Sequence, residues 1–218
     1  MPFAARRRDD PMPALAPLAG LTIARELDPR AMAALQERGE DELRARFARL
    51  HRAYVASMHG APAAWGWVAT REAEIGELGS RFTLPSRERY LWNFVTRPAH
   101  RGRGIYPRLL QAIVRAESIE AERFWIAYAP ENRASGAGIA KAGFADVAEM
   151  SFDDAGRPAV RALVAGGGAL ASRVLGLPEL TDALAPCWRC VRAGRGAMAC
   201  REGTCRCDYQ VARSGCTA

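Results

Sequence analysis

The residues from Thr96 to Pro107, Thr-Arg-Pro-Ala-His-Arg-Gly-Arg-Gly-Ile-Tyr-Pro, carry the clearest chemical information in this chain. Two glycines let the backbone approach a bulky anion, because neither has a Cβ atom. Successive backbone N–H groups in such a turn form an anion-binding hollow, and the start of the next helix adds about half a positive charge. Arg101 and Arg103 add full charges. The stretch therefore predicts a turn that binds a phosphate, and a pyrophosphate would suit it.

Two other phosphate motifs do not fit this stretch. The dinucleotide fingerprint needs a third glycine three residues after Gly104, where Pro107 stands. The P-loop needs Gly-Lys followed by Ser or Thr, and the only lysine of the chain is Lys141. A glycine-rich surface turn that binds nothing is the alternative for the Gly-Arg-Gly tripeptide taken alone.

The flanks of this turn and a second motif give it a context. The turn, Thr96-x-Pro-x-x-Arg-Gly-x-Gly104, follows an apolar strand-like run and precedes a helix that contains a Leu-Leu pair. Farther on, Asn132-Arg-Ala-Ser135 opens another helix, and Lys141-Ala-Gly-Phe144 closes it. Over roughly residues 20–152, this pair of motifs resembles the GCN5-related N-acetyltransferases (GNAT).

The resemblance implies an α/β fold, a GNAT-type mixed sheet flanked by helices, and acetyl-CoA as the co-substrate. The implied activity is acetyl transfer to a primary amine by direct attack in a ternary complex, since the matching region contains no cysteine for a covalent intermediate. Backbone groups of Phe94, Val95 and Thr96 would pair with the pantetheine arm. The amides that would hold the pyrophosphate belong to Arg101, Gly102, Arg103, Gly104, Ile105 and Tyr106. Asn132 and Ser135 would contact the cofactor from the facing helix.

Two positions depart from the family pattern. Tyr106 stands where the turn motif usually has Gly or Ala, and its ring adds bulk near the phosphates. Ile139 stands where the family often has a tyrosine that acts as the acid, and an isoleucine cannot protonate a thiolate. A non-catalytic acyl-CoA-binding or regulatory module is therefore the alternative to an enzyme.

The chemistry of acetyl transfer requires groups that move protons. An amine with a pKa near 10.4 is neutral in only about 4 of 10,000 molecules at pH 7, so a general base helps. Glu77 is the first candidate for that base, with a solvated loop carboxylate as its alternative role. Asn93 can orient an amine or a water but cannot take its proton. Tyr128 is the candidate acid, with a half-buried core aromatic as its alternative role.

The six cysteines all follow Pro186. Cys187, Cys190, Cys200 and Cys205 have a spacing that predicts a four-thiolate zinc site, although the second pair is looser than the usual Cys-x-x-Cys. Few apolar residues surround them, so a disordered extension is the alternative.

Apolar periodicity and turn residues predict the elements that must position these groups. The order is β-α-α-β-β-β-α-β-α-β, which is typical of a mixed α/β domain around one sheet. The predicted strands are 21–27, 52–58, 63–69, 90–95, 124–128 and 144–152. The predicted helices are 30–37, 41–50, 107–117 and 132–141.

Composition and charge then bound the organisation of the chain. Residues 1–18 are expected to be a flexible lead, 19–154 the acyltransferase domain, 155–186 a helical extension and 187–218 a cysteine-rich basic tail. The net charge is +7, but most of it lies in the tail, so nucleic-acid binding is unlikely on this distribution. No apolar run reaches the length of a membrane span, and no secretory signal is present, so we expect a cytoplasmic protein. The acceptor would be a small-molecule or peptide amine, and a homodimer is possible.

Overall fold

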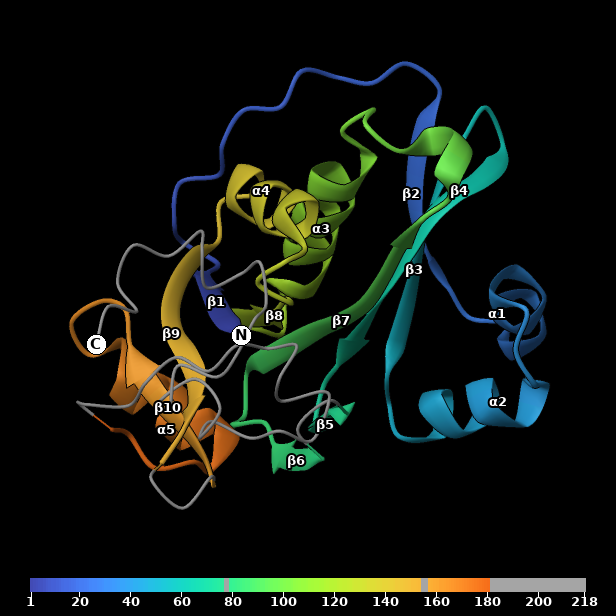
Figure 1. Ribbon diagram of the computed structural model, residues 1–218. Helices are drawn as coiled ribbons and strands as arrows, with labels where there is room; N and C mark the ends of the chain where they lie inside the picture. Colours follow the sequence, from blue (N-terminus) through green and yellow to red (C-terminus); the bar gives the residue numbers. More distant parts are fainter. Residues whose placement is uncertain (77–78, 154–156, 181–218) are drawn as a thin grey trace.

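The computed structural model describes residues 1–76, 79–153 and 157–180 (Figure 1). Eight strands form one sheet in the order β10-β9-β1-β8-β7-β4-β3-β2, in which β7 and β8 are parallel and the other neighbours are antiparallel. The strands are β1 (Pro2–Arg7), β2 (Leu21–Glu26), β3 (Arg52–Met58), β4 (Ala61–Ala69), β7 (Glu88–Thr96), β8 (Arg123–Ala127), β9 (Ala145–Phe152) and β10 (Pro158–Ala162). A separate hairpin joins β5 (Glu72–Ile75) to β6 (Ser80–Thr83).

Five α-helices cover the two faces of this sheet. They are α1 (Pro29–Gln36), α2 (Glu40–Ala48), α3 (Ile105–Glu117), α4 (Arg133–Lys141) and α5 (Gly167–Leu175), with one 3-10 turn, η2 (Pro98–His100). Helix α3 buries Leu109, Leu110 and Ile113 in the largest core cluster, against alternate residues of the strands. On the other face, α5 packs on β9 and β10, while α1 and α2 lie at the far end of the sheet beside β3 and β4 (Figure 1).

The expected elements between residues 21 and 152 agree closely with the observed ones. Each predicted strand and helix exists, and its bounds differ by a few residues at most. The α/β class with a mixed sheet is therefore confirmed. Strands β5 and β6 are not among the expected elements.

The expectation of a flexible lead is wrong for Pro2–Arg7. These residues form β1, which lies between β8 and β9 and pairs with both. The segment lacks β-branched residues, so its intrinsic preference for a strand is weak. It forms a strand because its backbone pairs with the free N–H and C=O groups of β8 on one side and of β9 on the other. The Arg6 side chain is buried and donates to the carbonyl oxygens of Asp10, Pro11 and Gly143.

The expected helical extension is also wrong in part. Residues 155–186 are expected to be helical, but Pro158–Ala162 form β10 and, among the described residues of this segment, Gly167–Leu175 form a helix. Strand β10 completes its hydrogen bonds on the exposed edge of β9, and α5 packs on the same two strands. This part of the extension therefore belongs to the main sheet. Within the described residues, no helix is both long and apolar enough to cross a membrane.

A first prediction concerns β1. Phe3 is fully buried, and its ring stacks on that of Trp125 with centroids 4.7 Å apart. Phe3→Ala should lower the free energy of unfolding by about 3–5 kcal/mol, because it removes this contact and leaves a cavity. Urea denaturation measures the change. The control is Ile119→Ala, since Ile119 is 87% exposed and its loss should cost less than about 0.5 kcal/mol. Equal stabilities for Phe3→Ala and the wild type would contradict the placement of β1.

Candidate active site

Strand β7 contains a bulge that separates it from β8. Between the pairs Trp67–Trp92 and Trp65–Val95, β4 has one residue, Gly66, and β7 has two, Asn93 and Phe94. A Cβ atom on Gly66 would overlap the Phe94 ring, so this glycine leaves the space that the ring occupies. Asn93 adopts a left-handed conformation with φ of 53°. Such bulges bend a strand and redirect its side chains.

The strand therefore diverges from its parallel neighbour. Pairing of β7 with β8 ends at Leu91 opposite Ile126, whereas β7 continues to Thr96. Along this last part, β7 is paired on its other side with β4. The edge that faces away from β4 is thus available to hydrogen-bond an extended ligand.

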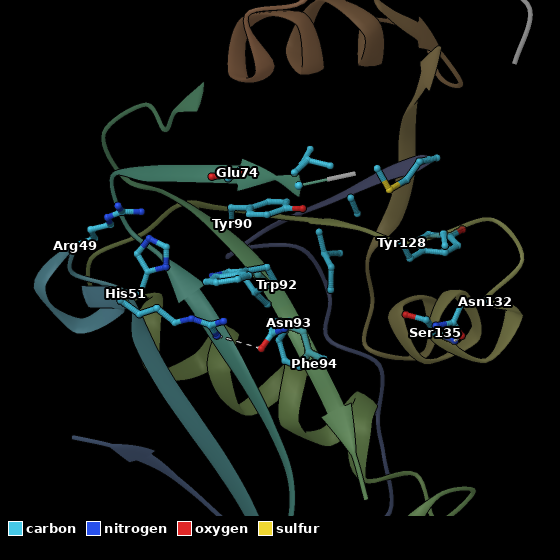
Figure 2. Close-up of a pocket in the computed structure, with 18 of the residues that line it drawn as sticks. Arg49, His51, Glu74, Tyr90, Trp92, Asn93, Phe94, Tyr128, Asn132 and Ser135 are labelled. Carbon is cyan, nitrogen blue, oxygen red and sulfur yellow. Dashed lines mark hydrogen bonds between the residues drawn. The ribbon is translucent and has the colours of Figure 1, made fainter. Parts of the chain in front are cut away.

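A cavity of about 1090 Å³ lies beside this diverging edge (Figure 2). It runs from α2 and the β5 strand, past the bulge, to the start of α4. Asn93, Phe94, Tyr106, Tyr128, Asn132 and Ser135 line it, so the fold brings six of the predicted site residues together. Figure 2 shows Asn93 and Phe94 between Arg49 and His51 on one side and Tyr128, Asn132 and Ser135 on the other.

The predicted phosphate turn follows directly on β7. Gly102 and Gly104 have φ of 74° and 71°, in the region that favours glycine, and Gly104 precedes the first residue of α3. Arg101 donates from Nε to the carbonyl oxygen of Thr96 at 3.1 Å, which ties the turn to the end of β7. The turn residues before Tyr106 lie outside the lining of the cavity, as do Val95 and Thr96.

The bulk of Tyr106 is accommodated by α4. A Cβ atom on Gly138 would overlap the Tyr106 ring, and the Tyr106 hydroxyl lies 3.4 Å from Ser135 Oγ. The ring also packs against Phe94, with centroids 5.4 Å apart. Burial raises the pKa of Tyr106 to about 12, so the phenol stays protonated over the physiological range.

Tyr128 meets the same helix in the same way. A Cβ atom on Gly136 would lie 2.7 Å from the Tyr128 ring. The Tyr128 hydroxyl donates to Asp146 Oδ2 at 2.7 Å. Asn132 caps α4, since its Oδ1 accepts a bond from the Ser135 N–H at 3.0 Å. The two glycines that weaken α4 as a helix former are therefore the positions where it contacts tyrosine rings.

The opposite end of the cavity is formed by α2 and the start of β3. The Arg46 guanidinium pairs with Glu42 at 2.7 Å and lies over the rings of Trp67 and Trp92. It also donates from Nη1 to Asn93 Oδ1 at 3.3 Å, the dashed line in Figure 2. His51 bonds through Nε2 to the Glu72 carbonyl, and burial lowers its pKa, so its imidazole is neutral at pH 7.

A comparison with protein-family models now identifies the family. Residues 18–145 match the model described as Acetyltransferase (GNAT) domain. The chain belongs to the GNAT acetyltransferase family. This confirms the resemblance inferred from the turn and from the α4 motif.

Solved GNAT structures are similar to this chain at low sequence identity. A GCN5-related N-acetyltransferase from Kribbella flavida shares 16% identity with a TM-score of 0.43, covering 66% of this chain and 53% of that one. A GNAT-family protein from Novosphingobium aromaticivorans shares 20% with a TM-score of 0.45, covering 66% and 59%. YncA of Salmonella typhimurium, solved with its cofactor acetyl-CoA, shares 16% with a TM-score of 0.44, covering 61% and 84%. This chain thus spans less than two thirds of the first two proteins. No curated protein matches it.

Sequence reasoning missed the α2 side of this GNAT cavity. Arg46, Arg49, His51 and Glu74 line it, but none belongs to a local motif. Glu77, the predicted base, lies outside the described residues, although Gly76 lines the cavity.

The predicted zinc ligands also lie outside the described residues. Cys187, Cys190, Cys200 and Cys205 fall within the segment that begins at residue 181, so the tail site stays a prediction. Across residues 1–76, 79–153 and 157–180, no group of three or more His, Cys, Asp or Glu side chains could hold a metal ion.

A second prediction tests the contact between α4 and the turn. Replacing glycine by alanine inside a helix normally stabilises it by up to about 1 kcal/mol. Gly138→Ala should instead destabilise the protein by about 1–3 kcal/mol, because the new methyl group would displace the Tyr106 ring. Thermal and urea unfolding measure the change. In a Tyr106→Ala background, where the ring is absent, Gly138→Ala should raise the free energy of unfolding, as glycine-to-alanine changes in helices normally do. A stabilising Gly138→Ala in the wild-type background would contradict this packing.

Proposed function

We propose that this protein transfers an acetyl group from acetyl-CoA to a primary amine by direct attack in a ternary complex. The observation that carries the proposal is the continuity of the diverging β7 edge with the turn that follows it, together with the cavity beside the bulge of that edge. Only a ligand that is long, extended and phosphorylated at one end would use all three. Acetyl-CoA has this shape, with its thioester at the end opposite the pyrophosphate.

In this proposal the pyrophosphate is bound by the backbone amides from Arg101 to Tyr106. Positive φ at Gly102 and Gly104 turns these N–H groups toward one side, and the start of α3 adds its partial positive charge. The Arg101 side chain is engaged with the Thr96 carbonyl, so it shapes the turn, whereas Arg103 is exposed and can approach the phosphates.

The pantetheine arm would then follow the β7 edge from Thr96 back toward the bulge. Backbone groups of Phe94, Val95 and Thr96 lie on the part of β7 that β8 no longer pairs. Asn132 and Ser135 line the facing wall. This path brings the thioester to the cavity near Asn93, where a backbone N–H of the bulge can donate to the carbonyl oxygen as it becomes an oxyanion.

The transfer itself removes two protons from the ammonium form of the acceptor and needs stabilisation of the leaving group. A base takes a proton from the ammonium form of the acceptor, and the neutral nitrogen attacks the thioester carbon. The tetrahedral intermediate collapses, the C–S bond breaks, and the electron pair leaves with sulfur as a thiolate. The amide product loses its second nitrogen proton to solvent or to the thiolate.

Tyr106 is the side chain we place at the leaving thiolate. Ile139, at the family's usual acid position, is 1% exposed and belongs to the core. The Tyr128 hydroxyl already donates to Asp146, which leaves it no second proton for sulfur. Tyr106 lines the cavity, and its hydroxyl is held only by a long contact with Ser135. With a pKa of about 12 it acts as a hydrogen-bond donor, since full transfer to a thiolate with a pKa near 8.5 is uphill.

Glu77 remains our proposed base. It follows Gly76, a residue of the cavity wall, and a carboxylate is a suitable acceptor for the proton. His51 lines the same wall and is neutral, but its basic Nδ1 is buried and therefore not accessible to an amine in the cavity. Asn93 orients the acceptor and has no basic atom.

The third prediction tests the function and the turn together. Purified protein should release CoA thiol when mixed with acetyl-CoA and a primary amine, as measured with a thiol reagent. Gly104→Asp should abolish both turnover and thermal stabilisation by acetyl-CoA, because an aspartate adds charge and bulk at a left-handed position beside the pyrophosphate. Gly39→Asp is the control, since Gly39 has open space around it and lies at the start of α2.

The outcomes separate the two functions that the sequence allowed. Stabilisation by acetyl-CoA without thiol release across a broad amine panel would favour the non-catalytic binding module. Undiminished acetyl-CoA binding by Gly104→Asp would refute the placement of the pyrophosphate.

The fourth prediction separates the two proton-handling roles. Glu77→Gln should lower kcat most strongly near neutral pH and recover as pH rises, because the acceptor then deprotonates without help. Tyr106→Phe should lower kcat by about 10-fold at every pH from 6 to 10, since its pKa of about 12 lies above this window. Both variants should keep acetyl-CoA affinity within a few-fold. A pH-independent loss in Glu77→Gln, or unchanged kcat in Tyr106→Phe, would remove that residue from the mechanism.

A further inference from the structure

The α2 side of the cavity carries two arginines, three positions apart, and their surroundings differ. Arg46 is held on all sides: it pairs with Glu42, and its guanidinium carbon lies 5.1 Å and 4.8 Å from the ring centroids of Trp67 and Trp92. Only 13% of its side chain is exposed. The charge of the Arg46 guanidinium is therefore neutralised by Glu42, and its planar face is covered by the two tryptophan rings. Arg46 thus has a structural role and is not available to bind a charged ligand.

Arg46 instead fixes the chemical character of Asn93. A guanidinium can only donate hydrogen bonds, so the Asn93 oxygen must be the atom that faces Arg46, at 3.3 Å. The two N–H groups of the Asn93 amide are then left for the cavity that this residue lines. A reversed amide would place its N–H groups against the Arg46 donors, so the hydrogen bond from Arg46 holds this orientation. Asn93 thus presents a donor to the acceptor substrate.

Arg49 is different, because it lines the cavity, is exposed and forms no ion pair with any described residue.

The acidic residues of the wall do have partners. Glu42 is shared by Arg38 and Arg46, and Glu74 pairs with Arg81 at 2.9 Å. Among the arginines of the described lining, Arg49 is therefore the one whose charge is not balanced by a neighbouring carboxylate.

We propose that the acceptor is a small primary amine that also carries a carboxylate, as an amino acid does. Arg49 would bind the carboxylate, and the Asn93 amide would donate to one of its oxygens while the amine lies at the bulge, next to the thioester. A polycationic amine would meet the unbalanced Arg49 charge and find no free lining carboxylate among the described residues. This inference names the substrate class of the proposed acetyltransferase and rests on that function.

The test compares amines in matched pairs: an amino acid, such as phenylalanine, and the amine without its carboxylate, here 2-phenylethylamine. Several side chains are used, and each kcat/KM for acetyl-CoA-dependent thiol release is corrected for the neutral fraction of the amine. Wild-type protein should prefer the carboxylate-bearing member by about 10-fold or more, which is the range of one charge-assisted hydrogen bond.

Two variants connect that preference to the named residues. Arg49→Gln should reduce it to about 2-fold, mainly through KM of the amino acid, whereas Arg44→Gln, whose partner is Glu40 and which does not line the cavity, should leave it intact. Asn93→Asp keeps an oxygen facing Arg46 but replaces the donors by a negative charge, so it should lower the preference as well. A rise in turnover for Asn93→Asp would mean that this position serves as a base, and would overturn the donor role.

The outcomes distinguish a failure of the proposed substrate class from a failure of the proposed acetyl transfer. Thiol release that is equal or faster with the amines lacking a carboxylate would overturn the substrate class and leave acetyl transfer standing. Thiol release with neither member of any pair, while acetyl-CoA still stabilises the protein, would overturn the substrate class and count against the enzyme. A preference that survives Arg49→Gln unchanged would overturn the assignment of Arg49.

Discussion

The one-residue mismatch between β4 and β7 is the constraint on which the rest of the site depends. It exists because Gly66 leaves room for the Phe94 ring and because Asn93 accepts a left-handed backbone. The extra residue bends β7 away from β8, and the separated strands leave one backbone edge beside a cavity. Without the bulge, the parallel pair would continue, and its hydrogen bonds would occupy the edge that we assign to the cofactor.

The second structural theme is the packing of tyrosines against glycines of α4. Gly136 and Gly138 lower the helix propensity of this segment, but they allow the rings of Tyr128 and Tyr106 to lie against its backbone. The large residue in the turn motif and the small residues in the facing helix are therefore two halves of one arrangement. In this arrangement the phenol of Tyr106 lines the cavity. Ile139, at the family's usual acid position, lies in the hydrophobic core.

A strand from the start of the chain occupies an interior position of the sheet. Strand β1 separates β8 from β9, so the central parallel pair is connected to the outer strands through residues more than a hundred positions away. Arg6 strengthens this connection by donating to the carbonyl of Gly143, which has a φ of 93° and follows α4. The wall that carries Asn132 and Ser135 is thus held in place partly by the first few residues.

The sequence by itself determined what depends on short stretches of backbone. The positive φ of Gly102 and Gly104 and the Asn132 cap of α4 depend on local residue types. The sequence predicts the glycine turn, the start of α4 and the strands of the main sheet between residues 21 and 152. The family followed from two such motifs at their separation. These features are local because φ, capping and periodicity involve residues within a few positions of each other.

Tertiary structure alone decided what depends on distant partners. Strands β1 and β10 lack a strong intrinsic preference and became strands because an open sheet edge offered hydrogen bonds. The contact of Arg46 with Asn93 joins residues 47 positions apart, and no spacing rule foretells it. Hydrogen bonds and charges act between residues that are close in space but distant in sequence. The α2 end of the cavity therefore acquires its fixed Asn93 amide donor and its unpaired Arg49 only when α2 is packed against β7.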